Sequence, residues 1–137
     1  MREKALVSSC LLGVPCRWHG KKLHLSSYVK RFLRENPQVK LILVCPEILG
    51  GLPCPRPPNK RKNGRAFFTC EDKRDRKDIT LEEVTGNLIL GSQKTLDIAQ
   101  SNNVKLAILC NWSPSCDRTG FTGKLLTEKG IKVVNSW

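Results

Sequence analysis

The sequence predicts an α/β fold: a single three-layer domain in which a mostly parallel sheet carries helices on both faces. Short runs of consecutive apolar residues recur along the chain, and longer segments with helical spacing separate several of them. Strands that are apolar throughout are typical of parallel sheets buried on both faces. The chain has 137 residues, and domains usually span roughly 100–200 residues. We therefore take residues 1–137 as one domain.

The first part of the chain is typical of a β-α-β unit. Residues 5–9 (ALVSS) and 40–45 (KLILVC) are short apolar runs that predict strands. Between them, residues 26–35 have apolar side chains at helical spacing and begin with Ser26, a favourable N-cap residue. This segment predicts a helix that connects two parallel strands.

The second part of the chain continues the alternation. Thr85 is a candidate N-cap for a helix that runs to residue 102. Two apolar runs, 104–109 (VKLAIL) and 131–135 (IKVVN), predict two more strands. Residues 65–69 (RAFFT) predict a further strand, whose place in the sheet does not follow from the sequence.

Basic residues dominate the charge of the chain. Lys and Arg total 24 against 12 Asp and Glu, so the formal net charge is +12, which favours an anionic partner or substrate. The stretch 53–78 is rich in proline, lysine and arginine, and we expect a loop or an extended insert there. No apolar run approaches the roughly 20 residues of a membrane helix, and the start does not have the pattern of a signal peptide. We expect a cytoplasmic protein without a membrane partner.

Cysteines follow three of the predicted strands. Cys10 and Cys45 end the first two, and the strand 104–109 leads into Cys110 and Cys116. The carboxyl ends of parallel strands meet at one edge of a sheet, where ligands bind, so we expect several thiols to converge there. Seven cysteines without a secretory signal indicate metal binding or thiol chemistry rather than disulfides. Closely spaced cysteine pairs of the structural zinc type are missing from the sequence, which favours an iron–sulfur cluster over zinc.

Three motifs occur in order along the chain. They are SCLLGVPCR at 9–17, CPEILGGLPCPRPP at 45–58, and SPSC at 113–116 followed by FTGK at 121–124. Together they resemble the thiouracil desulfidase family, and the resemblance covers nearly the whole chain. It implies a [4Fe-4S] cluster held by three cysteines, with one iron open to the sulfur of a thiocarbonyl group. By motif position, the ligands are Cys10, Cys45 and Cys116.

The expected reaction is desulfuration of a thiolated pyrimidine, a thiouracil or thiouridine-type base or nucleotide. Water adds to the thiocarbonyl carbon and sulfur leaves as hydrogen sulfide, without net redox change. A general base must lie within hydrogen-bond reach, and Glu47 is a candidate because it is two residues from Cys45. Ser113 is a candidate for orienting water or substrate. Arg17 and Arg56 carry planar guanidinium groups suited to a substrate carbonyl or phosphate.

The chain departs from the usual family pattern at several places, two of which lie near the expected site. Cys54 stands where threonine is common, and Asn59-Lys60 replaces the more usual Ala-Glu. Because Cys54 adds a thiol near the site, participation of Cys54 or Cys16 stays open, whereas the second change bears on substrate identity. Cys70 and Cys110 are interpreted as small buried core residues.

Two other classes of function are alternatives. The charge of +12 and the basic stretch suit a small RNA-binding module with a structural metal, and the cysteines also suit a metal or redox sensor. The sequence has no aromatic-interleaved or repeated RNA-binding motif. RNA is therefore less favoured as a partner than a small thiopyrimidine, free or phosphorylated.

Overall fold

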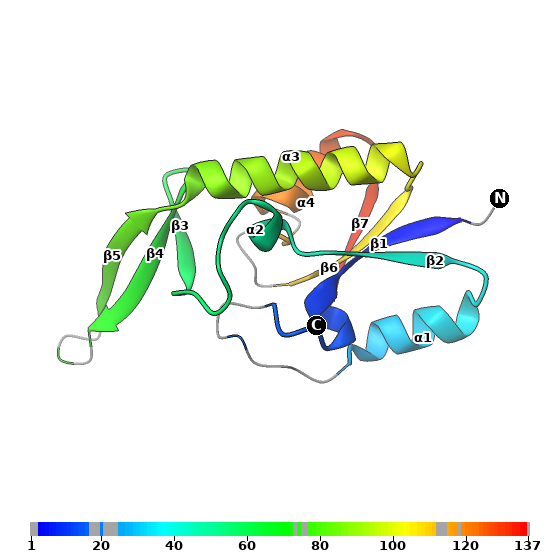
Figure 1. The fold of residues 1–137 in the computed structure, drawn as a ribbon, viewed down its shortest axis with the longest axis horizontal. Helices are drawn as coiled ribbons and strands as arrows, with labels where there is room; N and C mark the ends of the chain where they lie inside the picture. Colours follow the sequence, from blue (N-terminus) through cyan, green and yellow to red (C-terminus); the bar gives the residue numbers. More distant parts are fainter. Residues whose placement is uncertain are drawn as a thin grey trace.

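The computed structural model describes residues 3–16, 20, 25–72, 74, 77–111, 115–117 and 119–136. Four parallel strands form its central sheet in the order β2-β1-β6-β7 (Figure 1). The strands are β1 (Lys4–Ser8), β2 (Lys40–Val44), β6 (Leu106–Cys110) and β7 (Lys132–Ser136). Each coincides within two residues with a strand that the sequence predicts.

Helices cover both faces of this sheet. Figure 1 shows α1 (Ser27–Glu35) on one side and α3 (Thr85–Ser101) with α4 (Phe121–Glu128) on the other. The predicted three-layer α/β fold is therefore confirmed. The longest described helix is α3, with 17 residues, and no helix in the described ranges is long and apolar enough to cross a membrane.

The core explains why the strands are apolar throughout. Leu6 and Val7 of β1 and Ile108 and Leu109 of β6 have no exposed surface. Successive residues of a strand point to opposite faces of the sheet, so complete burial of neighbours requires cover on both sides. The helices on the two faces supply that cover.

Three helical segments are not evident from the sequence. A 3-10 helix, η1 (Ser9–Leu12), follows β1 directly, and α2 (Pro46–Leu49) begins one residue after β2. Both are too short to show helical spacing of apolar residues. Within α4, Gly123 has low helix propensity and obscures the pattern.

A small sheet begins in the stretch 53–78, where a loop or an extended insert is expected. Three antiparallel strands form it near the start of α3 (Figure 1). They are β3 (Asn59–Lys62), β4 (Arg65–Asp72) and β5 (Lys77–Glu83). The missed signal is Asn63-Gly64, with φ angles of 51° and 76°, because this dipeptide is typical of a two-residue hairpin turn. The strand predicted at 65–69 is the first part of β4.

The two expected helix caps have different outcomes. Ser26 Oγ accepts a hydrogen bond from the Val29 N–H at 3.3 Å, so the predicted N-cap of α1 is confirmed. The prediction for Thr85 is wrong, because Thr85 is already inside α3. Its hydroxyl accepts from the backbone N–H of Ala66 at 2.8 Å and thereby connects α3 to β4.

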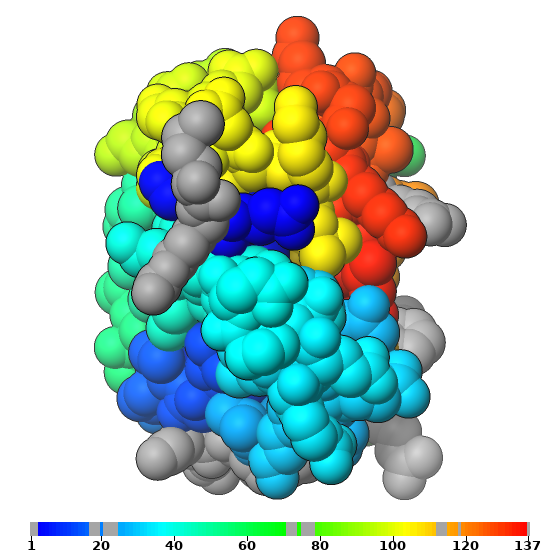
Figure 2. Space-filling view, turned by 90° about the vertical axis from the view of Figure 1, so that its right-hand side faces the viewer, coloured from blue at the N-terminus to red at the C-terminus, as the bar shows by residue number. Residues whose placement is uncertain are grey.

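The four strands of the central sheet begin at one end of the sheet and finish at the other. Figure 2 shows the end at which the strands begin, where the start of β1 and the segments leading into β2 (cyan), β6 (yellow) and β7 (red) lie side by side. Since all four strands are parallel, their carboxyl ends all lie at the opposite end. That opposite end carries Cys10, Cys45 and Cys110.

Backbone contact fixes the position of α2 on α3. A Cβ atom on Gly91 would lie 1.9 Å from the carbonyl oxygen of Pro46, and one on Gly50 would lie 1.9 Å from that of Asn87. The Asn87 amide also donates to the Gly50 carbonyl at 2.8 Å. Because α2 starts immediately after Cys45, this contact also positions the end of β2.

Alanine at Gly91 should destabilise the protein, because the added methyl group overlaps Pro46. We expect the free energy of unfolding to fall by about 1–3 kcal/mol, the usual effect of overpacking. Gly86→Ala is the matched control in the same helix, since nothing lies within 4 Å of its added Cβ, and it should stabilise by up to about 1 kcal/mol. Denaturant unfolding of both variants measures the difference. Equal stability of the two variants would contradict a rigid contact.

Candidate functional site

The candidate site lies at the carboxyl ends of β1, β2 and β6. Strand β1 pairs with β2 on one side and with β6 on the other, so the order of connections reverses between β1 and β6. In open α/β sheets, ligands bind beyond the carboxyl ends at such a reversal. Here Cys10 lies in η1 after β1, Cys45 follows β2, and Cys110 is the last residue of β6.

Five cysteine side chains form one interacting group, which we call the thiol group: Cys10, Cys16, Cys45, Cys110 and Cys116. Cys45 is half-buried and the other four are buried. The structure thus brings the three predicted ligands together and adds two neighbours. The core position interpreted for Cys110 is correct as to burial, but its thiol also contacts Cys10 and Cys116.

The two remaining cysteines lie outside this group. Cys54 is exposed, and its thiol donates to the carbonyl oxygen of Pro15 at 3.0 Å. Cys70 is exposed on β4 of the small sheet, which corrects its interpretation as a buried core residue. An exposed strand position and a buried one look alike in a short run such as RAFFTC, because only the fold decides which face is covered.

Close packing of the thiols opposes ionisation of most of them. Hydrogen bonding to Cys110 and to Cys16, together with burial, raises the pKa of Cys10. Hydrogen bonding to Cys16 and burial likewise raise the pKa of Cys45. In contrast, hydrogen bonds with Cys10 and Cys45 lower the pKa of Cys16. One thiolate stabilised by its neighbours is favoured over several, and only a bound cation would support several thiolates at once.

The Ser8 hydroxyl donates a hydrogen bond to the thiol of Cys116. The backbone N–H of Cys110 donates to Ser8 Oγ at 3.0 Å, and Ser8 Oγ donates to Cys116 Sγ at 3.5 Å. A backbone N–H can only donate, so the hydroxyl proton of Ser8 is left for the sulfur. This contact partly offsets the effects of Cys110 and burial, which raise the pKa of Cys116.

A chain of hydroxyl groups holds the loop that carries Cys116. Ser92 Oγ donates to the carbonyl oxygen of Leu88 at 2.7 Å, and it lies 2.9 Å from Thr122 Oγ1, which lies 2.8 Å from Ser115 Oγ. Each hydroxyl has one proton, so Thr122 donates to Ser92 and Ser115 donates to Thr122. The residue before Cys116 is thereby attached to both α4 and α3.

A buried ion pair stands beside the thiol group. Arg56 Nε donates to Glu47 Oε2 at 3.0 Å, and Arg56 Nη2 contacts the same oxygen. Arg56 Nη1 donates to the carbonyl oxygens of Cys16 and Pro53, each at 3.1 Å. Burial alone would lower the pKa of Arg56, but the charge of Glu47 raises it. The second carboxylate oxygen, Oε1, accepts from Asn59 Nδ2 at 3.1 Å.

Of the residues predicted for catalysis and substrate binding, the structure describes two, Glu47 and Arg56. Glu47 and Arg56 lie next to the cysteines, and the Arg56 fork is directed to protein acceptors. Its predicted contact with substrate stays a prediction. Arg17 and Ser113, predicted for substrate binding and catalysis, lie outside the described residues. Asn59 is the residue that the sequence analysis did not assign to the site, and only its place in a family motif pointed to it.

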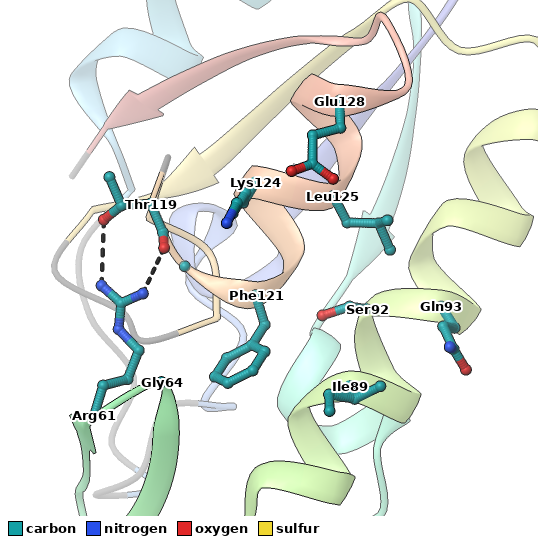
Figure 3. A pocket seen from close by; sticks show the side chains of 11 residues that line it. Arg61, Gly64, Ile89, Ser92, Gln93, Thr119, Phe121, Lys124, Leu125 and Glu128 are labelled. Atoms are coloured by element: carbon teal, nitrogen blue, oxygen red, sulfur yellow. Dashed lines mark hydrogen bonds between the residues drawn. The ribbon is translucent and has the colours of Figure 1, made fainter.

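A separate cavity of about 400 Å³ opens between β3, α3 and α4 (Figure 3). Arg61 lies at one edge of it and donates to the Thr119 carbonyl and to Thr119 Oγ1, the latter at 3.2 Å. Lys124 is exposed at the same cavity, and Phe121 and Ile89 provide apolar surface. The cavity thus combines cationic and apolar walls with the carboxylate of Glu128, close to the loop that carries Cys116.

No three Cys, His, Asp or Glu side chains in the described part of the chain are arranged to hold a single metal ion. A [4Fe-4S] cluster makes a different demand, because each cysteine ligand binds a separate iron. Thiols that lie in contact at one edge of the sheet without converging on a single point are compatible with that demand.

A family model and a solved structure that are similar to this chain both belong to thiouracil desulfurases. Residues 5–136 match the family model described as 2-thiouracil desulfurase. The uncharacterized protein YbbK of Bacillus subtilis (strain 168) is 33% identical over 131 residues, which cover 92% of this chain and 84% of that protein. A solved structure of the [4Fe-4S]-dependent thiouracil desulfidase TudS is similar with a TM-score of 0.75 and 30% identity, covering 98% of this chain and 91% of that one. The chain therefore belongs to the 2-thiouracil desulfurase family, the family that its motifs indicate.

Proposed function

We propose that this protein is a [4Fe-4S]-dependent desulfidase that converts the C=S group of a thiopyrimidine to C=O. Each turnover consumes one water and releases one hydrogen sulfide, so no electrons are exchanged overall. The observation that carries the proposal is the thiol group beside the Glu47–Arg56 pair, in a chain of the 2-thiouracil desulfurase family. The similarity to TudS supports both the cofactor and the reaction.

The chemistry of the thiol group fits such a cluster. Thiolates are its usual ligands, and we assign Cys10, Cys45 and Cys116 to this role. The Ser8 hydroxyl on Cys116 Sγ adds a donor of the kind that tunes cluster thiolates. When bound, a cluster with three cysteine ligands supplies an open iron, a soft Lewis acid that prefers sulfur to oxygen.

In this proposal Glu47 accepts the proton of the attacking water. Its two oxygens already accept from Arg56 and Asn59, yet an ionised carboxylate has capacity for further donors. The hydrogen bonds from Arg56 hold the Glu47 carboxylate in a fixed orientation. Arg56 is therefore a positioning residue for Glu47. Ser113 and Arg17 remain the candidates for orienting water and for contacting the substrate.

Loss of a proposed ligand should abolish cluster binding. We expect Cys45→Ser to retain little iron after anaerobic reconstitution, because a serine oxygen is a much harder ligand than a thiolate. Cys54→Ser and Cys110→Ser should keep their iron, and Cys70→Ser is the matched control because Cys70 is exposed on β4. Iron and sulfide per chain and the visible absorption spectrum are measured. Full iron content in Cys45→Ser would refute the assignment, and zinc in place of iron would favour the RNA-binding alternative.

Glu47→Gln should keep the cluster and lose turnover. The amide preserves the shape and can still accept from Arg56, but it is not a base, so we expect kcat to fall by about 100-fold or more. Glu83→Gln is the control, since Glu83 pairs with Arg65 at 3.7 Å on the exposed small sheet. Iron content and thermal unfolding are recorded with the rate of sulfide release. Near wild-type kcat in Glu47→Gln would assign the base to another group.

We further propose that the preferred substrate is an anionic thiopyrimidine, such as a thiouridine monophosphate. The net charge of +12 attracts anions at long range. Lys124 and Arg61 line the cavity near the loop of Cys116, and a phosphate beside such groups gains charge-assisted hydrogen bonds. A free base lacks both contributions.

The order of kcat/KM tests this preference. We expect the monophosphate to exceed thiouridine and thiouracil, and its advantage to shrink at high salt because salt screens exposed charges. Lys124→Gln should reduce kcat/KM for the monophosphate by about 2–5-fold, the scale of an exposed charge contact. Lys105→Gln, an exposed lysine at the far end of the sheet, should not. Equal values for the three substrates at all salt concentrations would contradict the preference.

A further inference from the structure

Asn59 has an unused acceptor beside the proposed base. It is the first residue of β3, and its Nδ2 donates to Glu47 Oε1 at 3.1 Å. The other end of the same amide, Oδ1, is buried and has no hydrogen-bond partner among the described residues. Buried polar atoms without a partner are rare in folded proteins, so this oxygen calls for a physical reason.

The orientation of the amide is determined by its neighbour. Were the amide turned over, Oδ1 would face a carboxylate oxygen of Glu47, and two acceptors would repel each other. Because the amide group is planar and rigid, the hydrogen bond from Nδ2 to Glu47 also fixes the position of Oδ1 close to the Glu47 carboxylate. The backbone of Asn59 is held in place through its pairing with Phe68.

The nearby protein donors are engaged elsewhere. The Nε and Nη2 groups of Arg56 contact Glu47, and Nη1 donates to the carbonyl oxygens of Cys16 and Pro53. The described donors near Oδ1 therefore have other acceptors, and a bound molecule can supply the donor that Oδ1 lacks among the described residues. A thiopyrimidine carries such a donor, the ring N–H adjacent to the thiocarbonyl carbon.

We propose that Asn59 Oδ1 accepts a hydrogen bond from this ring N–H, and that Asn59 thereby selects thiopyrimidines with an unsubstituted N3. This inference rests on the proposed function. One side chain would contact Glu47 through Nδ2 and the substrate through Oδ1, and would hold the reacting carbon at a set distance from the base.

A pair of substrates tests the inference: 4-thiouracil and its N3-methyl derivative. The wild-type protein, loaded with its cluster, should prefer 4-thiouracil in kcat/KM by about 5–100-fold, the scale of leaving one buried acceptor unpaired. In Asn59→Ala the ratio should approach one, mainly through a loss with 4-thiouracil. Asn102→Ala is the matched control, because the Asn102 amide has partners at both ends and lies at the far end of the sheet; it should keep the wild-type ratio.

Binding of the products provides a readout independent of turnover. Calorimetry under anaerobic conditions should give tighter binding of uracil than of 3-methyluracil to the wild type, and similar binding of the two to Asn59→Ala. Asn59→Ser serves the same purpose if the alanine variant folds poorly, and iron content is checked in each variant.

The outcomes separate this inference from the proposed function. Active wild-type protein that treats the two substrates alike would overturn the role of Asn59 and leave the proposed function intact. Full discrimination in Asn59→Ala would also overturn it. A loaded wild-type protein that releases no sulfide from 2-thiouracil, 4-thiouracil or their nucleotides would contradict the proposed function and this inference with it.

Discussion

The parallel pairing of β1 with both β2 and β6 is the constraint on which the site depends. It brings Cys10, Cys45 and Cys110 to one edge of the sheet, although long stretches of chain separate them. The pairing is maintained by side chains buried on both faces of β1 and β6. A loss of packing anywhere between the sheet and its helices therefore acts on the spacing of the thiols as well as on stability.

A second set of contacts joins the small sheet to this edge. Asn59 begins β3, and its amide reaches Glu47 at the start of α2, while Arg56 bridges Glu47 and the backbone of Cys16. The close approach of Gly50 and Gly91 presses α2 against α3. In consequence, the carboxylate is surrounded by residues from separate segments. Loss of one partner of such a buried ion pair strongly destabilises the folded protein, because the other charge stays buried without compensation.

The sequence was informative where the physical signal was local and continuous. Apolar runs predicted the four parallel strands, and their ends predicted the convergence of Cys10, Cys45 and Cys116, because strand direction follows from the fold class. The small sheet was missed because β3 is a run of charged residues, in which a strand differs from a loop only through its partner. The ion pair between Glu47 and Arg56 was missed for a related reason: two residues near one motif gave no indication that they would face each other.

The hydroxyl chain of Ser115, Thr122 and Ser92 has a consequence for the movement of protons. Its hydrogen bonds all run in one direction and end on the Leu88 carbonyl, which cannot accept a proton and pass it on. A chain of this kind is a dead end for proton conduction, although it fixes the loop firmly. Along these hydroxyls, therefore, no proton passes from the loop of Cys116 into α3.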